Sequence, residues 1–276
     1  MIINSEVITS RNNPIVKWAC TLQDKKGRER EEAFLAEGIK LTIEAIDANL
    51  TLTHIFLSQS RKDVYISEIL AREGRENTKA LKVTVLEDSV FEKISTEKAP
   101  QGIISVIKYL DFFSYMDIIN KEDFYFASNE RTIILSSIRD PSNLGSVIRS
   151  AVAFGTERII LSDDCADVYN PKTVRSAMGS LFRVKVTRVR SLDKLIIALR
   201  ESNRRVFAAE LADKAISLST LNVHPGDCFV IGNEGHGISS EISSLCDNSV
   251  YIPISNKTES LNASVAAAIF MWEQSK

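Results

Sequence analysis

Short apolar segments alternate with helical patterns through the second half of the chain, and this alternation limits the possible folds more than any other feature. Each apolar segment spans four residues, a length that suits a buried strand better than a buried helix. Strands separated by helices favour a mostly parallel sheet with helices on its faces. The predicted strands are 132–135, 158–161, 183–186, 206–209, 228–231 and 250–253, and the predicted helices are 143–153, 171–181, 191–202 and 238–245.

A second, smaller α/β pattern occupies the first part of the chain. Residues 1–20 are rich in turn signals, and the charged run 24–32 is typical of an exposed helix or turn. Aromatic and acidic residues then interrupt the alternation at 111–130. We therefore predict a domain at 1–110, a linker or linking helix at 111–130, and a second domain at 131–276. In the first domain we expect strands at 33–36, 53–57, 82–86 and 102–107, with helices near 41–46, 63–72 and 90–94.

Composition argues against several classes of protein. The N-terminus lacks a basic head followed by an apolar run, and no apolar stretch approaches the roughly 18 to 20 residues of a membrane-spanning helix. We therefore expect a cytoplasmic protein without a membrane partner. Neither the cysteines nor the histidines have the spacing of a disulfide framework or a metal site, so no metal is expected. The cysteines are Cys20, Cys165, Cys228 and Cys246, and the histidines are His54, His224 and His236.

The distribution of charge permits a nucleic-acid partner without establishing one. The net charge is −2, but residues 172–205 hold ten basic residues against two acidic ones. Such a local excess could neutralise several phosphates. The same residues could equally form solvated faces, so the charge pattern leaves RNA binding open.

The first motif is the segment 143–155, NLGSVIRSAVAFG, which follows a predicted strand and the turn Asp140-Pro141-Ser142. Proline here requires extended or turn geometry before a helix begins. Asn143 could cap that helix, and Arg149 would then lie nearly two turns inside it. Alone, the segment is most simply a capped helix with a surface arginine.

The second motif is the glycine-rich loop 232–237, GNEGHG, at the end of an apolar strand. Its three glycines indicate a place where the backbone passes close to another group. The spacing is not the G-x-G-x-x-G dinucleotide fingerprint, and the acidic residue expected about 20 positions later is absent. A carboxylate inside the loop, Glu234, makes this signal more specific.

The third motif begins with Tyr251-Ile252-Pro253-Ile254 and continues, after a short loop, with the segment 260–269, SLNASVAAAI. Ser260 or Asn262 would open a helix of small residues. The alanines let another backbone approach closely, as a dimer partner or the sheet would require. The helix can at the same time pack in the core.

The order of these motifs resembles the SpoU (TrmH-like) family of RNA 2′-O-ribose methyltransferases, part of the SPOUT superfamily. The likeness rests on N-x-G-x-x-x-R-x-A-x-A-F-G, then G-N-E-G-x-G, then I-P with S-L-N. Residues 1–107 also look like the family's N-terminal substrate-binding domain, which has a ribosomal-protein-like α/β fold. That weaker likeness rests on Ser10-Arg11-Asn12-Asn13, Glu37-Gly38 and Gln101-Gly102-Ile103. The chain departs from the family where Ile254-Ser255-Asn256 follows I-P in place of Met-Gly, which affects the expected shape of the cofactor loop.

The resemblance implies a catalytic domain with a C-terminal trefoil knot, S-adenosylmethionine as cofactor, and catalysis in a homodimer. By motif position, Gly232, Ile252 and Leu261 should contact the cofactor, largely through backbone atoms. A side chain at position 232 would fill the space of the adenosine.

The implied catalytic residues are Arg149, Asn143, Glu234 and Asn262. Two roles are open for Arg149: it acts as the base after a neighbouring cation lowers its pKa, or it orients an RNA phosphate that takes part. We favour the second, because a guanidinium suits bidentate phosphate binding. The other three residues would hold Arg149 and the ribose through hydrogen bonds.

The implied activity is S-adenosylmethionine-dependent methylation of a ribose 2′-hydroxyl in RNA. Ribosomal RNA of the large subunit (23S) is favoured over transfer RNA, because the N-terminal domain resembles ribosomal RNA-binding proteins. Alternatives are a transfer-RNA 2′-O-methyltransferase, a non-catalytic RNA-binding protein on the same fold, and a nucleotide-dependent oxidoreductase, which the missing fingerprint disfavours. The sequence leaves open the target nucleotide and any role in antibiotic resistance.

Overall fold

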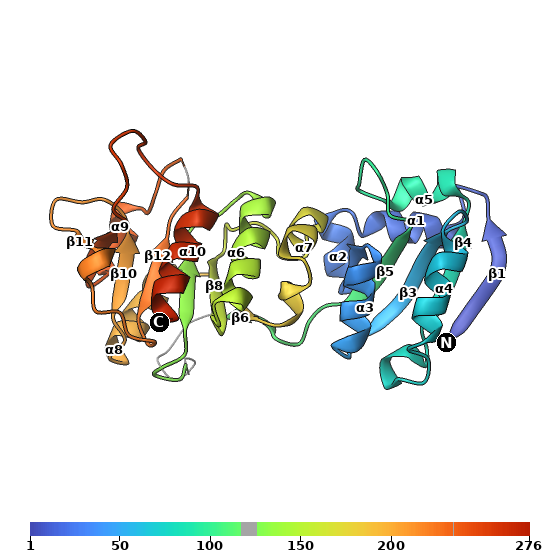
Figure 1. The fold of residues 1–276 in the computed structure, drawn as a ribbon, viewed down its shortest axis with the longest axis horizontal. Helices are drawn as coiled ribbons and strands as arrows, with labels where there is room; N and C mark the ends of the chain where they lie inside the picture. The colour runs from blue at the N-terminus through green and yellow to red at the C-terminus, as the bar shows by residue number, and fades with distance from the viewer. Residues whose placement is uncertain (117–125, 234) are drawn as a thin grey trace. The chain divides into compact units, whose positions relative to one another are not determined.

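The computed structural model describes residues 1–116, 126–233 and 235–276, which form two compact units (Figure 1). Met1–Leu110 and Asp167–Phe182 form the first unit, and Asp111–Ala166 and Arg183–Lys276 form the second. The range expected to be a linker, 111–130, contains a strand of the second unit, β6 (Phe113–Met116). Its aromatic residues have high strand propensity, which explains why part of this range extends a sheet. Residues 117–125 lie outside the described ranges.

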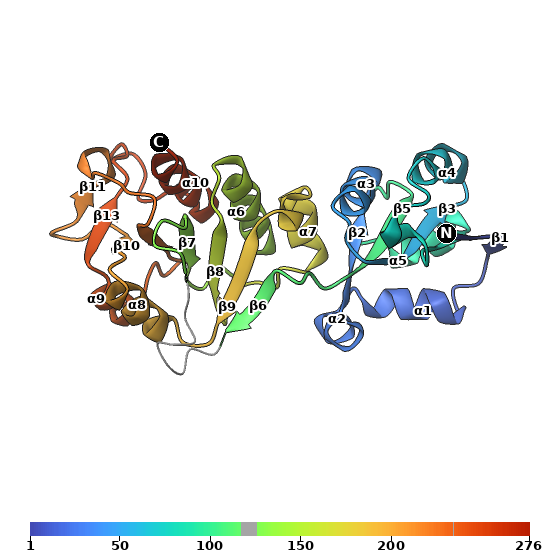
Figure 2. The ribbon, with the colours of Figure 1, turned by 90° about the horizontal axis from the view of Figure 1, so that it is seen from below.

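A five-stranded mixed sheet forms the centre of the first unit. Its strands are β1 (Ile2–Ile8), β2 (Ala33–Glu37), β3 (Leu52–Ser58), β4 (Lys82–Leu86) and β5 (Ile103–Lys108). The helices are α1 (Pro14–Thr21), α2 (Lys25–Glu31), α3 (Ile39–Asp47), α4 (Lys62–Leu70), α5 (Asp88–Ile94) and α7 (Pro171–Ala177). The strand order is β1-β4-β3-β5-β2, with β5 antiparallel to both of its neighbours. Figure 2 shows α3 and α4 on one face of this sheet and α1 on the other.

Two segments of the first unit differ from expectation. Residues 1–20, predicted as turns, contain β1 and α1, because β1 pairs in parallel with β4, a distant partner that no local pattern reveals. The charged run 24–32 contains α2, but Arg28 within it is only 1% exposed. Its guanidinium donates to the carbonyls of Leu22 and Gln23 and to the carboxylate of Asp167. The prediction of an exposed segment is therefore wrong for Arg28.

The second unit is an α/β layer structure built on an eight-stranded sheet. Its remaining strands are β7 (Thr132–Leu135), β8 (Arg158–Ser162), β9 (Lys185–Val189), β10 (Val206–Ala209), β11 (Ile216–Ser217), β12 (Cys228–Ile231) and β13 (Asn248–Tyr251). Its helices are α6 (Pro141–Ala153), α8 (Leu192–Glu201), α9 (Ser240–Leu245) and α10 (Ala263–Gln274). The strand order is β11-β13-β10-β12-β7-β8-β9-β6. Figure 2 shows α6 and α10 on one face and α8 and α9 on the other.

Every strand pair described in this sheet is parallel, which confirms the predicted fold class. Strands β7 and β12 are buried along their whole length, because helices cover both faces of the sheet. The strand predicted at 183–186 instead spans Lys185–Val189, because its pairing with β8 begins where Lys185 lies opposite Arg158.

The basic residues of 172–205 divide between the interior of the protein and its surface. Arg204 is 4% exposed and donates to two backbone carbonyls and to the hydroxyl of Thr132. Arg188 donates to four backbone carbonyls between residues 162 and 166. Arg200 and Arg205 form ion pairs with Asp247 and Asp227. The other basic residues of this segment, together with Arg200, are exposed, so phosphate binding by this segment stays a prediction.

Replacing Arg204 by alanine should destabilise the second unit. The substitution leaves buried carbonyls without a donor and opens a void, and we expect a loss of about 3 kcal/mol in the free energy of unfolding. Urea denaturation followed by circular dichroism measures this loss. The matched control is Lys194→Ala on α8, an exposed position where a change below about 0.5 kcal/mol is expected. Equal stability of the two variants would contradict a structural role for Arg204.

Candidate functional site

Two of the motif loops leave the sheet of the second unit at one edge. The glycine-rich loop follows β12, and the Ile252-Pro253 segment follows β13. Strand β10 lies between these two strands and pairs with both in parallel. The carboxyl ends of all three strands therefore meet at the same edge, which is where open parallel sheets usually bind their ligands.

A cavity of about 750 Å³ lies at this edge, a volume within the usual range for small-molecule sites. Gly232, Ile252 and Leu261, which the sequence predicted to contact a cofactor, all line it. The structure thus brings together three residues from three separate segments. Most of the wall is apolar, and it includes Ile231, Val250, Ala263, Ala266 and Phe270.

Gly232 is required by the loop itself. A Cβ atom at this position would lie 2.6 Å from the amide nitrogen of Ile238 and closer still to the backbone of Gly237. The loop closes there, because Asn233 and Gly237 exchange backbone hydrogen bonds of 3.1 and 2.8 Å. The sequence argument assigned the missing side chain to space for adenosine. The structure shows that backbone contact already excludes a side chain.

Asn233 fixes the conformation of this loop. Its side-chain nitrogen donates to the carbonyl of Ser137, which follows β7, at 2.9 Å. Its Oδ1 accepts from the backbone of Gly235 at 2.8 Å and of His236 at 3.3 Å. The sequence analysis gave Asn233 no role, although asparagine in a tight loop commonly bonds the backbone in this way. Glu234, the predicted catalytic carboxylate, lies outside the described residues.

The start of α6 differs from the prediction at one residue. Asp140, not Asn143, caps the helix, accepting from the backbone of Ser142 at 2.7 Å and of Asn143 at 3.0 Å. Pro141 occupies the first turn, where its missing N–H has no cost. The side-chain oxygen of Asn143 instead accepts from the Nδ2 of Asn262 at 3.1 Å.

Asn262 is the N-cap of α10, as one of the two predicted alternatives proposed. Its Oδ1 accepts from the backbone of Ser264 at 2.9 Å, while its Nδ2 reaches Asn143. One side chain thus links the N-terminal ends of α6 and α10. Arg149 is exposed on α6, and among the described residues neither asparagine bonds it. The predicted role of Asn143 and Asn262 in holding Arg149 and the ribose therefore stays a prediction.

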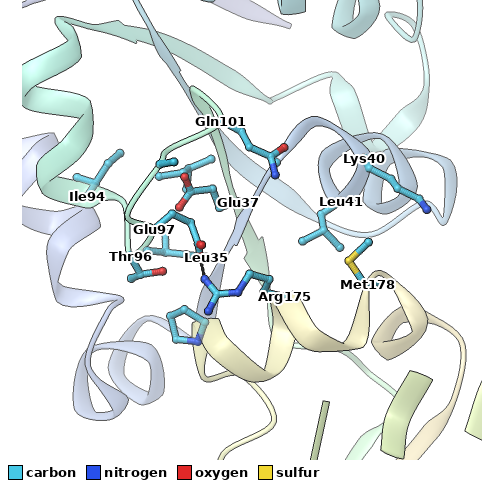
Figure 3. A pocket seen from close by; sticks show the side chains of 14 residues that line it. Leu35, Glu37, Lys40, Leu41, Ile94, Thr96, Glu97, Gln101, Arg175 and Met178 are labelled. Atoms are coloured by element: carbon cyan, nitrogen blue, oxygen red, sulfur yellow. Dashed lines mark ion pairs between the residues drawn. The ribbon is translucent and has the colours of Figure 1, made fainter. Parts of the chain in front are cut away.

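The first unit contains a smaller cavity, of about 110 Å³, lined by Glu37, Gln101 and Arg175 (Figure 3). Burial raises the pKa of Glu37, whose two oxygens accept from the Ser95 hydroxyl at 2.9 and 2.8 Å. Arg175 forms an ion pair with Glu97. Glu37 and Arg175 thus have partners within the first unit, and no residue that the motifs selected for cofactor binding or catalysis lines the cavity. The candidate site is therefore the cavity of the second unit.

Two further features were sought in the residues that the structure describes. No helix there combines the length and apolar character needed to cross a bilayer. No group of three or more histidine, cysteine, aspartate or glutamate side chains in the same ranges could hold a metal ion.

Two family models match the chain. The SpoU rRNA Methylase family matches residues 130–272, which include all three motifs. The MRM3-like substrate binding domain matches residues 13–105.

Characterised relatives resemble the chain over almost its whole length. The 23S rRNA (guanosine(2553)-2′-O)-methyltransferase RlmP of Bacillus subtilis (strain 168) is 27% identical over 97% of this chain and 98% of its own. The 23S rRNA (uridine(2479)-2′-O)-methyltransferase of Streptomyces viridochromogenes is 30% identical over 96% of this chain and 90% of its own. Among solved structures, the AdoMet-bound rRNA methyltransferase from Sinorhizobium meliloti has a TM-score of 0.79 and 28% identity, covering 99% of this chain and 97% of that one.

Replacing Gly232 by alanine should disturb the loop, because the new Cβ would meet rigid backbone. We expect a loss of about 2 kcal/mol in the free energy of unfolding and faster hydrogen exchange at the amides of 233 and 237. Gly235→Ala is the matched control, since a Cβ there would meet only the Asn233 side chain at an ordinary 3.4 Å. The account of Gly232 would be wrong if both substitutions were equally well tolerated.

Proposed function

The chain belongs to the SpoU rRNA methylase family, and we propose that it transfers a methyl group from S-adenosylmethionine to a ribose 2′-hydroxyl of 23S ribosomal RNA. The observation that carries this proposal is the cavity that unites Gly232, Ile252 and Leu261 at the carboxyl edge of the parallel sheet. The relatives named for 23S rRNA methylation support the choice of RNA. Such a substrate places the protein in the cytoplasm.

The cavity fits S-adenosylmethionine in size and chemistry. Its apolar wall, which includes Ile231, Leu261 and Phe270, suits the flat faces of adenine. Backbone groups of the glycine-rich loop and of Ile252 are available to its polar edge. The cofactor supplies a methyl group that its sulfonium already activates. The residues of the protein must therefore position the acceptor.

A ribose hydroxyl is a poor nucleophile, so the site must align it and assist removal of its proton. Asn143 and Asn262, hydrogen-bonded to each other, offer amide groups that would hold the ribose. Glu234 completes the proposed set. The exposed guanidinium of Arg149 is suited to bidentate binding of an RNA phosphate. We assign it that orienting role in preference to the role of base.

Two copies of the chain would form the active enzyme. Helices α6 and α10 expose an apolar face in which Val265 is 47% and Trp272 is 51% exposed. Phe154 packs its ring edge-on against Trp272, at 5.7 Å between centroids. A second copy would cover this face and bring Arg149 of one subunit toward the cofactor of the other. We also propose that the catalytic domain contains the C-terminal trefoil knot that the family resemblance implies.

We further assign RNA binding to residues 1–110 and methyl transfer to residues 131–276. The match of residues 13–105 to a substrate-binding domain supports this division. The compact units differ from it in one segment, Asp167–Phe182, which groups with the first unit.

Replacing Arg149 by alanine should slow methyl transfer strongly without weakening binding of the cofactor. Wild-type protein should transfer tritiated methyl from S-adenosylmethionine to ribosomal RNA, whereas Arg149→Ala should be slower by about 100-fold or more in kcat. The Kd for S-adenosylmethionine, measured by calorimetry, should change less than twofold. Lys194→Ala is the control for loss of a surface cation.

The same assay distinguishes the substrates. Label in ribosomal RNA alone supports the proposed target, and label in transfer RNA alone would replace it. A folded dimer that binds no S-adenosylmethionine would overturn the enzyme assignment and favour an RNA-binding protein.

An acidic substitution at Val265 should separate the two subunits, because it would place a charge within the proposed apolar interface. Light scattering after gel filtration should give the mass of a dimer for the wild type and of a single chain for Val265→Asp, with methyl transfer lost. Ile197→Asp is the matched control, since Ile197 is 43% exposed on α8, away from this face. A monomeric, active wild type would contradict the proposed assembly.

A further inference from the structure

Glu210 lies at the edge of the sheet where the carboxyl ends of β10, β12 and β13 meet, although no sequence motif includes it. It follows β10, the strand that pairs with β12 on one side and β13 on the other. Ala208 lies opposite Val230, and Ala209 lies opposite Val250. Continuing these registers places Glu210 level with the first residue of the glycine-rich loop and with Tyr251.

Hydrogen bonds confirm this position. The backbone N–H of Glu210 donates to the carbonyl of Val250 at 3.1 Å, which extends the ladder beyond β10. Glu210 lines the same cavity as Gly232 and Ile252. Glu210 therefore lies between two loops that the motifs assign to the cofactor.

One oxygen of the Glu210 carboxylate is fixed by the protein. Oε1 accepts from the hydroxyl of Ser249 at 2.8 Å and from that of Ser243. Within the described residues, Oε2 has no hydrogen-bond partner. The two serines thus hold the carboxylate in place and leave one oxygen for a ligand.

No cation in the described lining neutralises this carboxylate. The described residues that line the cavity include Glu210 and Glu259 but no lysine, arginine or histidine. The neighbouring thiol of Cys246 also stays uncharged, because burial, Glu210 and Asp247 together raise its pKa to about 12. The Glu210 carboxylate is held in place, and no cation of the described lining neutralises it. It can therefore bind either a neutral hydroxyl donor or a positively charged group of the ligand.

The order of the strands in the sheet indicates which of these two groups Glu210 contacts. The acceptor-side residues Asn143 and Asn262 lie at the start of α6 and α10, and α6 follows β7. Strand β12 separates β7 from β10 in the sheet. Strand β12 therefore separates Glu210 from the strand that leads to the acceptor-side residues, and this separation favours a contact with the nucleoside part of the cofactor.

Resting on the proposed function, we propose that Glu210 binds the ribose hydroxyls of the cofactor's adenosine through Oε2. A carboxylate that accepts from a ribose diol is a common device of nucleotide-binding sites on parallel sheets. The contact is independent of the methyl group. It should therefore strengthen binding of S-adenosylmethionine and of its product, S-adenosylhomocysteine, to the same extent.

Calorimetry on the full-length protein tests this assignment. Glu210→Gln retains the shape and one acceptor oxygen but replaces the other acceptor by a donor. We expect the Kd to rise about tenfold for both S-adenosylmethionine and S-adenosylhomocysteine. Glu241→Gln, at an exposed carboxylate on α9 outside the cavity lining, is the matched control and should stay within twofold. Thermal unfolding without ligand checks that both variants fold like the wild type.

A ligand without the hydroxyls gives the sharper result. The 2′,3′-dideoxy analogue of S-adenosylhomocysteine should bind the wild type about tenfold more weakly than the parent, yet show no further loss with Glu210→Gln. A loss confined to S-adenosylmethionine would overturn the assignment, because it would mean that the carboxylate senses the sulfonium charge. Unchanged affinities for both ligands would also overturn it while leaving the proposed function intact. Failure of the wild type to bind either ligand would overturn the proposed function and this assignment together.

Discussion

Parallel hydrogen bonding of β10 to both β12 and β13 decides where every part of the candidate site lies. Parallel neighbours require crossover connections, so each strand delivers its following loop to the same edge of the sheet. Three loops that are distant in sequence therefore meet around one cavity. The chemistry of the site follows from this meeting, because no single loop carries enough groups to hold a nucleoside.

Several arginines stabilise the fold through hydrogen bonds to backbone carbonyls. Arg28, Arg188 and Arg204 direct their guanidinium groups at backbone carbonyls, where a planar group with five donors satisfies several acceptors at once. Arg149 differs because it stands exposed on α6 without such bonds among the described residues. A count of charges along the sequence cannot separate these two uses, since it does not show which guanidinium groups reach backbone carbonyls.

The sequence revealed those parts of the structure that depend on local chemistry. The short apolar runs became buried parallel strands, and Asn262 became a helix cap, because each depends on neighbouring residues in the chain. The features that the sequence analysis did not predict depend on residues that are distant in the chain. Strand β1 depends on β4, the strand at Phe113–Met116 depends on β9, and the position of Glu210 depends on the order of strands in the sheet. Asn143 lost the predicted capping role because a better acceptor, Asp140, stands three residues earlier.

The glycine-rich loop closes through contacts of its own main chain. Gly232 packs against the backbone of Gly237, and Asn233 forms hydrogen bonds with the backbone of Gly235 and Gly237. A binding surface made of main-chain atoms is nearly the same for any sequence that closes the loop. Substitutions within the loop can therefore change cofactor affinity only slightly. Diversification of cofactor affinity must then act on side chains that border the loop from other strands. Positions at the ends of neighbouring strands are therefore where the affinity of such a site can evolve.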